Sequence, residues 1–172
     1  MAVLGVDGWR GRWAGALLDG RAVRLLELAD VAAVLAVPGA EVVAIDMPIG
    51  LSEDGVRACD LVPAIRQLDG ALGDPPDRRV VEVHPELAFR ELDARPRDPK
   101  TSARGAAQRL RALEPAMDVL DALAGAPDGL PLVGALDACA AAWSAARVAA
   151  GSARCVGDGR VDARGRVMRT CW

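Results

Sequence analysis

The chain has 172 residues, of which 52% are hydrophobic, so it can bury one substantial core, and we expect a single domain over residues 1–172. The formal net charge of -3 and the pI near 5.2 exclude a generally basic surface, so a nucleic-acid partner would have to bind a local arginine cluster. Lys100 is the only lysine. Basic side chains that are nearly all arginine suit bidentate phosphate contacts, but a GC-rich genome gives the same composition, and we favour that explanation.

The four cysteines predict no zinc site, because they include no Cys-x-x-Cys pair and the chain has one histidine. We expect free, buried thiols at all four positions: Cys59, Cys139, Cys155 and Cys171. Only a few apolar residues precede Asp7, and no later apolar run comes near the roughly 20 residues that a membrane helix requires. These features predict a cytoplasmic protein without a membrane partner, and they leave the oligomeric state open.

Short apolar runs separated by turn residues fill the first part of the chain. Residues 2–6, 12–18 and 22–28 are three such runs with glycines at the joints, which predicts a three-stranded antiparallel meander. Asp30 can cap a helix that reaches residue 36. Residues 41–45 then form a buried strand. Because it follows a helix, we expect this strand to pair in parallel with the first.

The rest of the chain is mostly helical in pattern. Apolar residues at helical spacing over residues 61–72 predict a helix, and residues 79–83 predict a strand. Three more helices are expected at residues 102–113, 116–124 and 134–150. The glycine- and arginine-rich tail predicts at most a short strand near Val167. The succession of elements indicates an α/β fold.

Acidic residues lie at the ends of these predicted elements. Asp7 ends the first strand, Asp46 ends the fourth, and Glu82 and Glu86 lie around the fifth. Carboxylates at the ends of neighbouring strands raise each other's pKa values unless a cation joins them, and Mg²⁺ or Mn²⁺ prefers such oxygen ligands. Asp137, where the last long helix begins, could supply a further ligand. Two such ions roughly 3.5–4 Å apart would activate a water molecule against a phosphodiester.

Each of these residues also has a purely structural explanation. Asp7 and Asp46 both precede turn-forming residues and can simply shape those turns. Asp137 suits the first turn of a helix, where an acid favours the macrodipole, and Glu82 can face solvent. For His84, Pro85 and Glu86 we favour a rigid strand exit with a satisfied histidine over general acid–base work, because a single histidine without a partner is weak support for catalysis.

Signatures of several other enzyme classes are missing from the sequence. It has no Walker A loop, no dinucleotide-binding glycine fingerprint and no Gly-x-Ser-x-Gly elbow. The segment from His84 to Glu86 is not followed by the Pro-Cys-x-x-Cys of a zinc deaminase. These absences leave the acidic residues as the main candidates for chemistry.

Four segments taken in order resemble the predicted ribonuclease-H-like nucleases, a domain-of-unknown-function family. They are Gly-Val-Asp-Gly-Trp-Arg-Gly-Arg-Trp at 5–13, Ala-Ile-Asp-Met-Pro-Ile-Gly-Leu at 44–51, Glu-Val-His-Pro-Glu-Leu-Ala-Phe at 82–89 and Leu-Asp-Ala at 136–138. The resemblance implies an RNase-H-like α/β fold. Its mixed five-stranded sheet would have three antiparallel meander strands followed by parallel β units, with helices on its flanks.

The resemblance also implies a site. Its candidate Mg²⁺ or Mn²⁺ ligands and catalytic acids would be Asp7, Asp46, Asp137 and one of Glu82 and Glu86. Substrate phosphates would be held by basic side chains in the matching segments: Arg10, Arg57, His84, Lys100 and Arg104. Arg104 and Arg109 are equally ordinary for a solvated helix face.

Two departures from the family pattern weaken the catalytic interpretation. A segment that usually follows the region of Asp60 is missing, and Val133-Gly134 stands where family members often carry an acidic pair. Our leading hypothesis is a metal-dependent nuclease acting on DNA or RNA. The alternative is an inactive domain of the same fold that binds nucleic acid, nucleotide or protein. An actin-like phosphotransferase ranks last, since such enzymes generally need two lobes.

Overall fold

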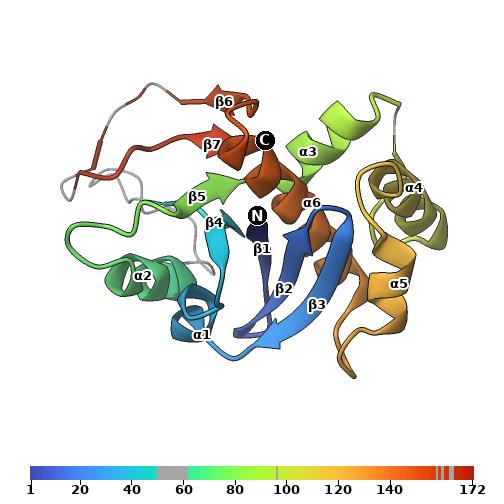
Figure 1. The fold of residues 1–172 in the computed structure, drawn as a ribbon, viewed down its shortest axis with the longest axis horizontal. Helices are drawn as coiled ribbons and strands as arrows, with labels where there is room; N and C mark the ends of the chain where they lie inside the picture. Colours follow the sequence, from blue (N-terminus) through green and yellow to red (C-terminus); the bar gives the residue numbers. More distant parts are fainter. Residues whose placement is uncertain (50–61, 96, 158, 160, 163–164) are drawn as a thin grey trace.

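In the computed structural model of the protein, the described residues are 1–49, 62–95, 97–157, 159, 161–162 and 165–172. A twisted sheet with helices on both faces forms the centre (Figure 1). The strands are β1 (Ala2–Trp9), β2 (Arg12–Asp19), β3 (Ala22–Leu28), β4 (Ala40–Asp46), β5 (Val80–Val83), β6 (Cys155–Val156) and β7 (Thr170–Cys171). The helices are α1 (Val31–Leu35), α2 (Val62–Ala71), α3 (Pro85–Leu92), α4 (Ala103–Leu113), α5 (Val119–Ala124) and α6 (Leu132–Ala149).

The α/β class and the arrangement of the first strands are confirmed. β1, β2 and β3 form the antiparallel meander, and β4 pairs in parallel with β1. Asp30 caps α1, since its side chain accepts a hydrogen bond from the backbone N–H of Ala33 at 2.8 Å. These elements could be predicted from the sequence, because short apolar runs, glycine turns and a capping aspartate are local features.

The strand count of five is wrong, because the described sheet has seven strands in the order β3-β2-β1-β4-β5-β7-β6. The two added strands contain two residues each, which is too short for any alternating pattern to reveal. They form where the tail returns beside β5, with Thr170 opposite Glu82 in a parallel pair. Their place depends on pairing with distant residues and not on a local signal.

A cystine corrects the expectation of four free thiols. Cys155 and Cys171 stand directly opposite each other in the antiparallel pair β6–β7 and form a disulfide. Cys139 is free and buried, as expected, and Cys59 lies outside the described residues. Disulfides are typical of oxidising compartments, so this one does not support the cytoplasmic location, which stays a prediction.

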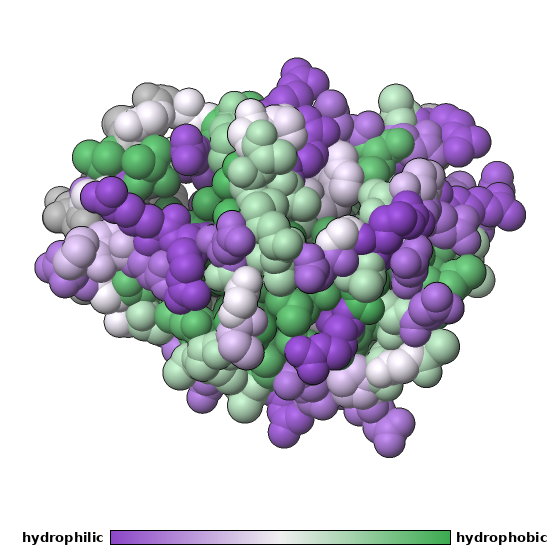
Figure 2. Space-filling model, viewed as in Figure 1, coloured by the Kyte–Doolittle hydropathy of each residue, from purple (hydrophilic) through white to green (hydrophobic). Residues whose placement is uncertain are grey.

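Two apolar cores lie on the two faces of the sheet. On one face α1 and α2 cover Leu4, Val6 and Ile45. On the other face α6 packs across β1, β2 and β4, with α3, α4 and α5 beside it (Figure 1). Figure 2 shows hydrophilic side chains gathered over the region of α4 on the outside of this second layer.

Helix α6 is the central helix of the second core. It is long and apolar enough to cross a membrane by length and composition, but 61% of it is buried inside the protein. Small residues let it approach the sheet closely. A Cβ atom at Gly5 would lie 2.0 Å from the backbone nitrogen of Ala142 and 2.3 Å from the carbonyl oxygen of Ala138, so only glycine fits there.

Candidate functional site

Strand alternation places two of the predicted acids on the same face of the sheet. Asp7 lies two residues beyond Gly5, and Asp46 lies two residues beyond Ala44, so both carboxyls point toward the layer of α6. The two residues are direct partners in the parallel pair β1–β4. The two carboxyl groups are close enough for the charge of Asp46 to raise the pKa of Asp7. The sequence thus predicts this pair of neighbours from strand order alone.

Helix α6 brings the third acid to the same place. The close approach at Gly5 positions the first turns of α6 over the ends of β1 and β4. A Cβ atom at Gly134 would lie 3.6 Å from Oδ2 of Asp7. Asp137, one turn further along the helix, is completely buried. Asp7, Asp46 and Asp137 together are called the carboxylate cluster below.

The carboxylate cluster holds its acids in an environment that disfavours their charge. Burial, followed by the negative charges of Asp137 and Asp46, raises the pKa of Asp7 to about 7. Burial likewise raises the pKa of Asp46 to about 6, although the nearby His84 opposes this shift. Near neutral pH the pair Asp7–Asp46 therefore carries a proton that two isolated carboxylates would not hold.

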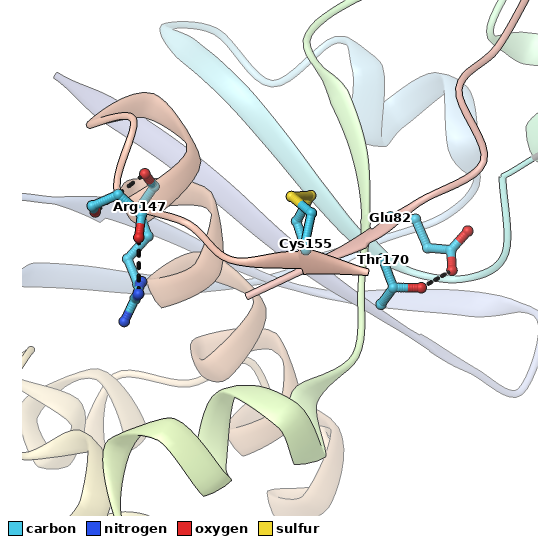
Figure 3. The surroundings of a disulfide bond; sticks show 6 residues. Glu82, Arg147, Cys155 and Thr170 are labelled. Carbon is cyan, nitrogen blue, oxygen red and sulfur yellow. Dashed lines mark hydrogen bonds between the residues drawn. A yellow bond between two sulfur atoms is a disulfide. The ribbon is translucent and has the colours of Figure 1, made fainter. Parts of the chain in front are cut away.

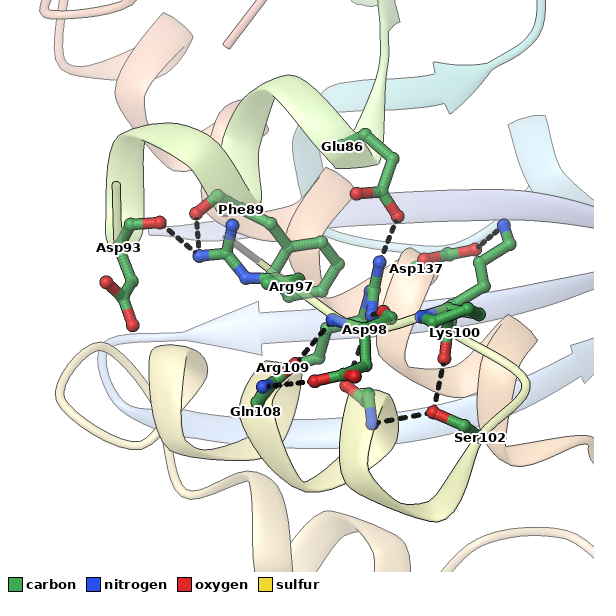
Figure 4. Close-up of polar contacts among 12 residues, drawn as sticks. Glu86, Phe89, Asp93, Arg97, Asp98, Lys100, Ser102, Gln108, Arg109 and Asp137 are labelled. Carbon is green, nitrogen blue, oxygen red and sulfur yellow. Dashed lines mark hydrogen bonds and ion pairs between the residues drawn. The ribbon is translucent and has the colours of Figure 1, made fainter. Parts of the chain in front are cut away.

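A lysine lies against the third carboxylate. The Nζ atom of Lys100 donates to Oδ2 of Asp137 at 2.6 Å (Figure 4), and the Asp137 side chain is only 1% exposed. Its Oδ1 atom is buried without a hydrogen-bond donor. Burial raises the pKa of Asp137 while Lys100 opposes the rise. Burial disfavours the charged lysine, yet Asp137, Asp7 and Asp46 together raise the pKa of Lys100 above its usual value.

Glu86 lies beside the cluster and is held by a buried arginine. Arg109 Nη2 donates to Glu86 Oε1 at 2.6 Å, and the arginine is 4% exposed (Figure 4). The charge of Glu86 is close enough to raise the pKa of Asp137. A solvated helix face is therefore wrong for Arg109. Its place in the buried stripe of α4, four residues after Gly105 and four before Leu113, could have revealed this.

The helix that carries Glu86 was not predicted. The rigid strand exit expected at Pro85 is wrong, because Pro85 occupies the first turn of α3. His84 precedes it as the N-cap residue. His84 is exposed, and its charge lowers the pKa of Asp46, so it lies near the carboxylate cluster.

Glu82 points away from the carboxylate cluster, because it alternates with the buried Val83 that packs toward α6. On the opposite face, its Oε2 accepts a hydrogen bond from the backbone N–H of Ile49 at 2.8 Å, and its Oε1 accepts one from the hydroxyl of Thr170 (Figure 3). There it lines a pocket between β5, residues 75–78 and residues 165–169. Of the two glutamates, Glu86 is thus the neighbour of the cluster.

The remaining predicted phosphate ligands differ in their positions. Arg10 lies in the turn between β1 and β2 with a positive φ of 46° and stacks over the ring of Trp9. Arg104 is exposed and pairs with Asp98 at 3.3 Å. Arg57 lies outside the described residues. Within the described part of the chain, Lys100 is the predicted phosphate ligand that forms an ion pair with a member of the carboxylate cluster.

A groove rich in arginine runs between the end of α3 and α4. Its lining residues are Asp93, Arg95, Arg97, Arg104, Ala107, Gln108 and Arg111. We call it the arginine groove. Arg97 connects it to the site, since its guanidinium stacks over Phe89, as does that of Arg109 (Figure 4). A local arginine cluster is what the overall charge requires of a nucleic-acid partner's site. Of the arginines in this groove, only Arg104 is among the phosphate ligands expected from the sequence.

The oxygen atoms of the carboxylate cluster are of the kind that binds a divalent metal ion. Among the described residues, no three His, Cys, Asp or Glu side chains are arranged so that they could hold a metal ion together. The acids nevertheless have the right chemistry for a hard divalent ion, because Oδ1 of Asp137 is buried without a donor and the raised pKa of Asp7 leaves a proton on the pair Asp7–Asp46 near neutral pH. Such an ion would replace that proton.

Comparison with known proteins gives one match. A family profile described as a protein of unknown function (DUF429) matches residues 5–62 and 57–161. No curated protein and no solved structure matches the chain. The matched residues include every member of the carboxylate cluster as well as Lys100 and Glu86.

Proposed function

The chain belongs to the DUF429 family, whose function is unknown, and we propose from its site that it is a metal-dependent nuclease. The observation that carries the proposal is the meeting of three buried or half-buried carboxylates, Asp7, Asp46 and Asp137, at the ends of β1, β4 and the start of α6. Such a concentration of like charge is costly to fold and is useful when a cation binds.

The strand order supports an RNase-H-like fold as part of this proposal. The five longest strands follow the order β3-β2-β1-β4-β5, with an antiparallel meander and then parallel pairs. The two matched segments of the family profile meet at residues 57–62. This is where the sequence resemblance places a missing segment, so the match also supports a shortened member.

Each residue of the cluster has a defined task in the proposed reaction. Asp7 and Asp46 would hold Mg²⁺ or Mn²⁺, with Asp137 as a further ligand through its unpaired Oδ1. When bound, the ion would lower the pKa of a water molecule and polarise the phosphoryl group. Lys100 would donate a hydrogen bond to a phosphate oxygen, and Glu86 with Arg109 would keep the opening of the site fixed.

The arginine groove supports a nucleic acid as the substrate. Four arginines face one acid along its lining, in a chain whose overall charge is negative. Guanidinium groups bind phosphates in bidentate fashion, so a row of them suits a phosphodiester backbone better than a small neutral ligand. Arg97 of the groove and Arg109, which pairs with Glu86 beside the cluster, both stack over Phe89, so the groove adjoins the proposed site.

The second candidate is an inactive binding domain of the same fold. The ion pair between Lys100 and Asp137 favours it, because a lysine that already compensates a carboxylate leaves less need for a metal. This candidate predicts binding of an oligonucleotide without turnover.

Cleavage of labelled single-stranded DNA and RNA in Mn²⁺ distinguishes the two candidates. We expect Mn²⁺-dependent cleavage by the wild type and a loss of about a hundredfold or more in Asp7→Asn and in Asp46→Asn, since each loses a charged ligand. Asp118→Asn is the matched control, because Asp118 lies in a surface ion pair with Arg21 far from the cluster. Cleavage that survives in both cluster variants would refute the proposal.

A further inference from the structure

The position of the only lysine is unusual for this chain. All other members of its 21 lysines and arginines are arginine, and a GC-rich genome explains such a bias. A genome bias toward arginine does not explain why one lysine remains. The exception is Lys100, whose Nζ lies 2.6 Å from Oδ2 of the buried Asp137.

The segment that carries Lys100 is held firmly in place. Arg109 donates to the carbonyl of Asp98 at 3.2 Å, and Gln108 both accepts from the Asp98 backbone and donates to its carboxylate, each at 2.8 Å. A Cβ atom at Gly105 would lie 2.1 Å from the carbonyl oxygen of Pro99, so the segment lies directly on α4 (Figure 4). Lys100 is thus presented to Asp137 by a rigid support.

An ammonium group differs from a guanidinium in ways that matter at this position. It is a compact point charge with three donors, whereas the planar guanidinium spreads its charge and needs a flat partner. Asp137 in turn lies in the first turns of α6, where a Cβ atom at Gly134 would be 3.6 Å from Oδ2 of Asp7. A compact positive charge among three carboxylates resembles a small metal ion more closely than any arginine could.

We propose that Lys100 takes the place of a second metal ion, so that the site binds one divalent cation, on the side of Asp7 and Asp46. This inference rests on the proposed metal-dependent function and specifies its metal content. Three ionised carboxylates and one ammonium leave a formal charge of -2, which one divalent ion neutralises. Lys100 then contacts the substrate phosphate from the side that a second ion would occupy, and Asp137 orients it.

The test is the stoichiometry of Mn²⁺ binding, measured by calorimetry and by electron paramagnetic resonance of free Mn²⁺, without substrate. We expect one ion per chain for the wild type and two for Lys100→Met, because the loss of the ammonium frees Oδ2 of Asp137 for a cation. Lys100→Arg keeps the positive charge and should stay at one ion. Arg104→Gln removes a nearby exposed charge and should also stay at one.

Stability controls keep the result interpretable. Lys100→Met leaves a buried carboxylate without its partner, so its folding is checked by circular dichroism and thermal unfolding. Lys100→Gln is neutral but retains a hydrogen-bond donor, and it replaces the methionine variant if that variant does not fold. It should likewise bind two ions.

The outcomes separate this inference from the proposed function. Two ions in the wild type, or a single ion in the folded Lys100→Met and Lys100→Gln variants, would overturn the role of Lys100 and leave a metal-dependent nuclease intact. No Mn²⁺ binding by the wild type, together with no Mn²⁺-dependent cleavage, would overturn both.

Discussion

Two acidic sites at the end of the same sheet differ sharply in how their charges are compensated. In the carboxylate cluster, Lys100 pairs with Asp137, burial raises the pKa of Asp7 and of Asp46, and Oδ1 of Asp137 has no donor. On the opposite face, Glu82 is compensated by hydrogen-bond donors. Each of its oxygens accepts a hydrogen bond, one from the backbone of Ile49 and one from Thr170. We call Glu82, Ile49, Thr170 and the cystine the Glu82 corner.

The difference indicates which acids are structural. Burying a carboxylate costs little when hydrogen-bond donors satisfy it, and it costs much when other carboxylates surround it. The Glu82 corner holds β5, β7 and the segment after β4 together, so its acid contributes to the fold. Within the described part of the chain, the carboxylate cluster makes one such bond, the ion pair that joins Asp137 of α6 to Lys100. Its arrangement is explained better by a ligand than by stability.

The largest expected effect comes from a change at Gly5, which packs on α6. This helix carries Asp137 of the carboxylate cluster and no residue of the Glu82 corner. Gly5→Ala places a Cβ atom 2.0 Å from the backbone of α6, which must move away from β1. We expect a loss of about 4 kcal/mol in the free energy of unfolding, measured by urea denaturation. Gly70→Ala, in α2 with open space around the new Cβ, is the control and should gain about 0.5–1 kcal/mol.

The same variant should disturb the cluster and spare the corner. Displacement of α6 moves Asp137 away from Asp7, whereas Glu82 lies on the other face of the sheet. If Gly5→Ala is as stable as the wild type, α6 does not approach β1 as closely as described.

The second effect acts on the corner and spares the cluster. The cystine closes a loop with a sequence separation of 16 residues. In the chain-entropy model, its removal in Cys171→Ser should cost about 3 kcal/mol in the free energy of unfolding. Thermal unfolding with and without reductant measures this, and reductant should not affect the variant further. Mn²⁺ binding should stay unchanged, and a large change would show that the two sites are coupled.

The sequence predicts the carboxylate cluster better than it predicts the corner. Alternation along β1 and β4, with a helix between them, is enough to place Asp7 beside Asp46. The face of Glu82 could not be decided, because the exposed and buried faces of β5 depend on helices that lie far away in the chain. β7 has no local pattern at all. It is defined by Thr170 and Cys171, which pair with residues of β5 and β6.

The same reasoning explains what was missed around the cluster. Proline is found both at the ends of strands and in the first turn of helices, so Pro85 is consistent with a strand exit and with a helix start. The helix forms here because α3 packs on α6, which lies far away in the chain. The pairing of Lys100 with Asp137 spans 37 residues and has no periodic signal. The single lysine among 21 basic residues is a sign of this pairing in the sequence. A GC-rich genome explains the excess of arginine but not the position of the lysine.

The smallest expected effect measures what the cluster costs the fold. The folded-state pKa of Asp7 is about 7 and its ordinary value is 3.8, so between these values the folded protein binds more protons than the unfolded chain. Stability therefore falls as the pH rises through this window, and the full cost is present above pH 7. Lowering the pH below 3.8 protonates Asp7 in both states and removes the cost.

Asp7→Asn should remove this cost at all pH values. Because Asp7 is partly exposed, we expect a gain of about 2 kcal/mol in the free energy of unfolding at pH 8, which shrinks as the pH falls and vanishes below the ordinary pKa of 3.8. Urea denaturation across this pH range provides the measurement. The matched control is Glu82→Gln, which weakens two hydrogen bonds and should lose about 1 kcal/mol at pH 8. If Asp7→Asn also loses stability there, Asp7 is a structural acid like Glu82, and the distinction between the two sites fails.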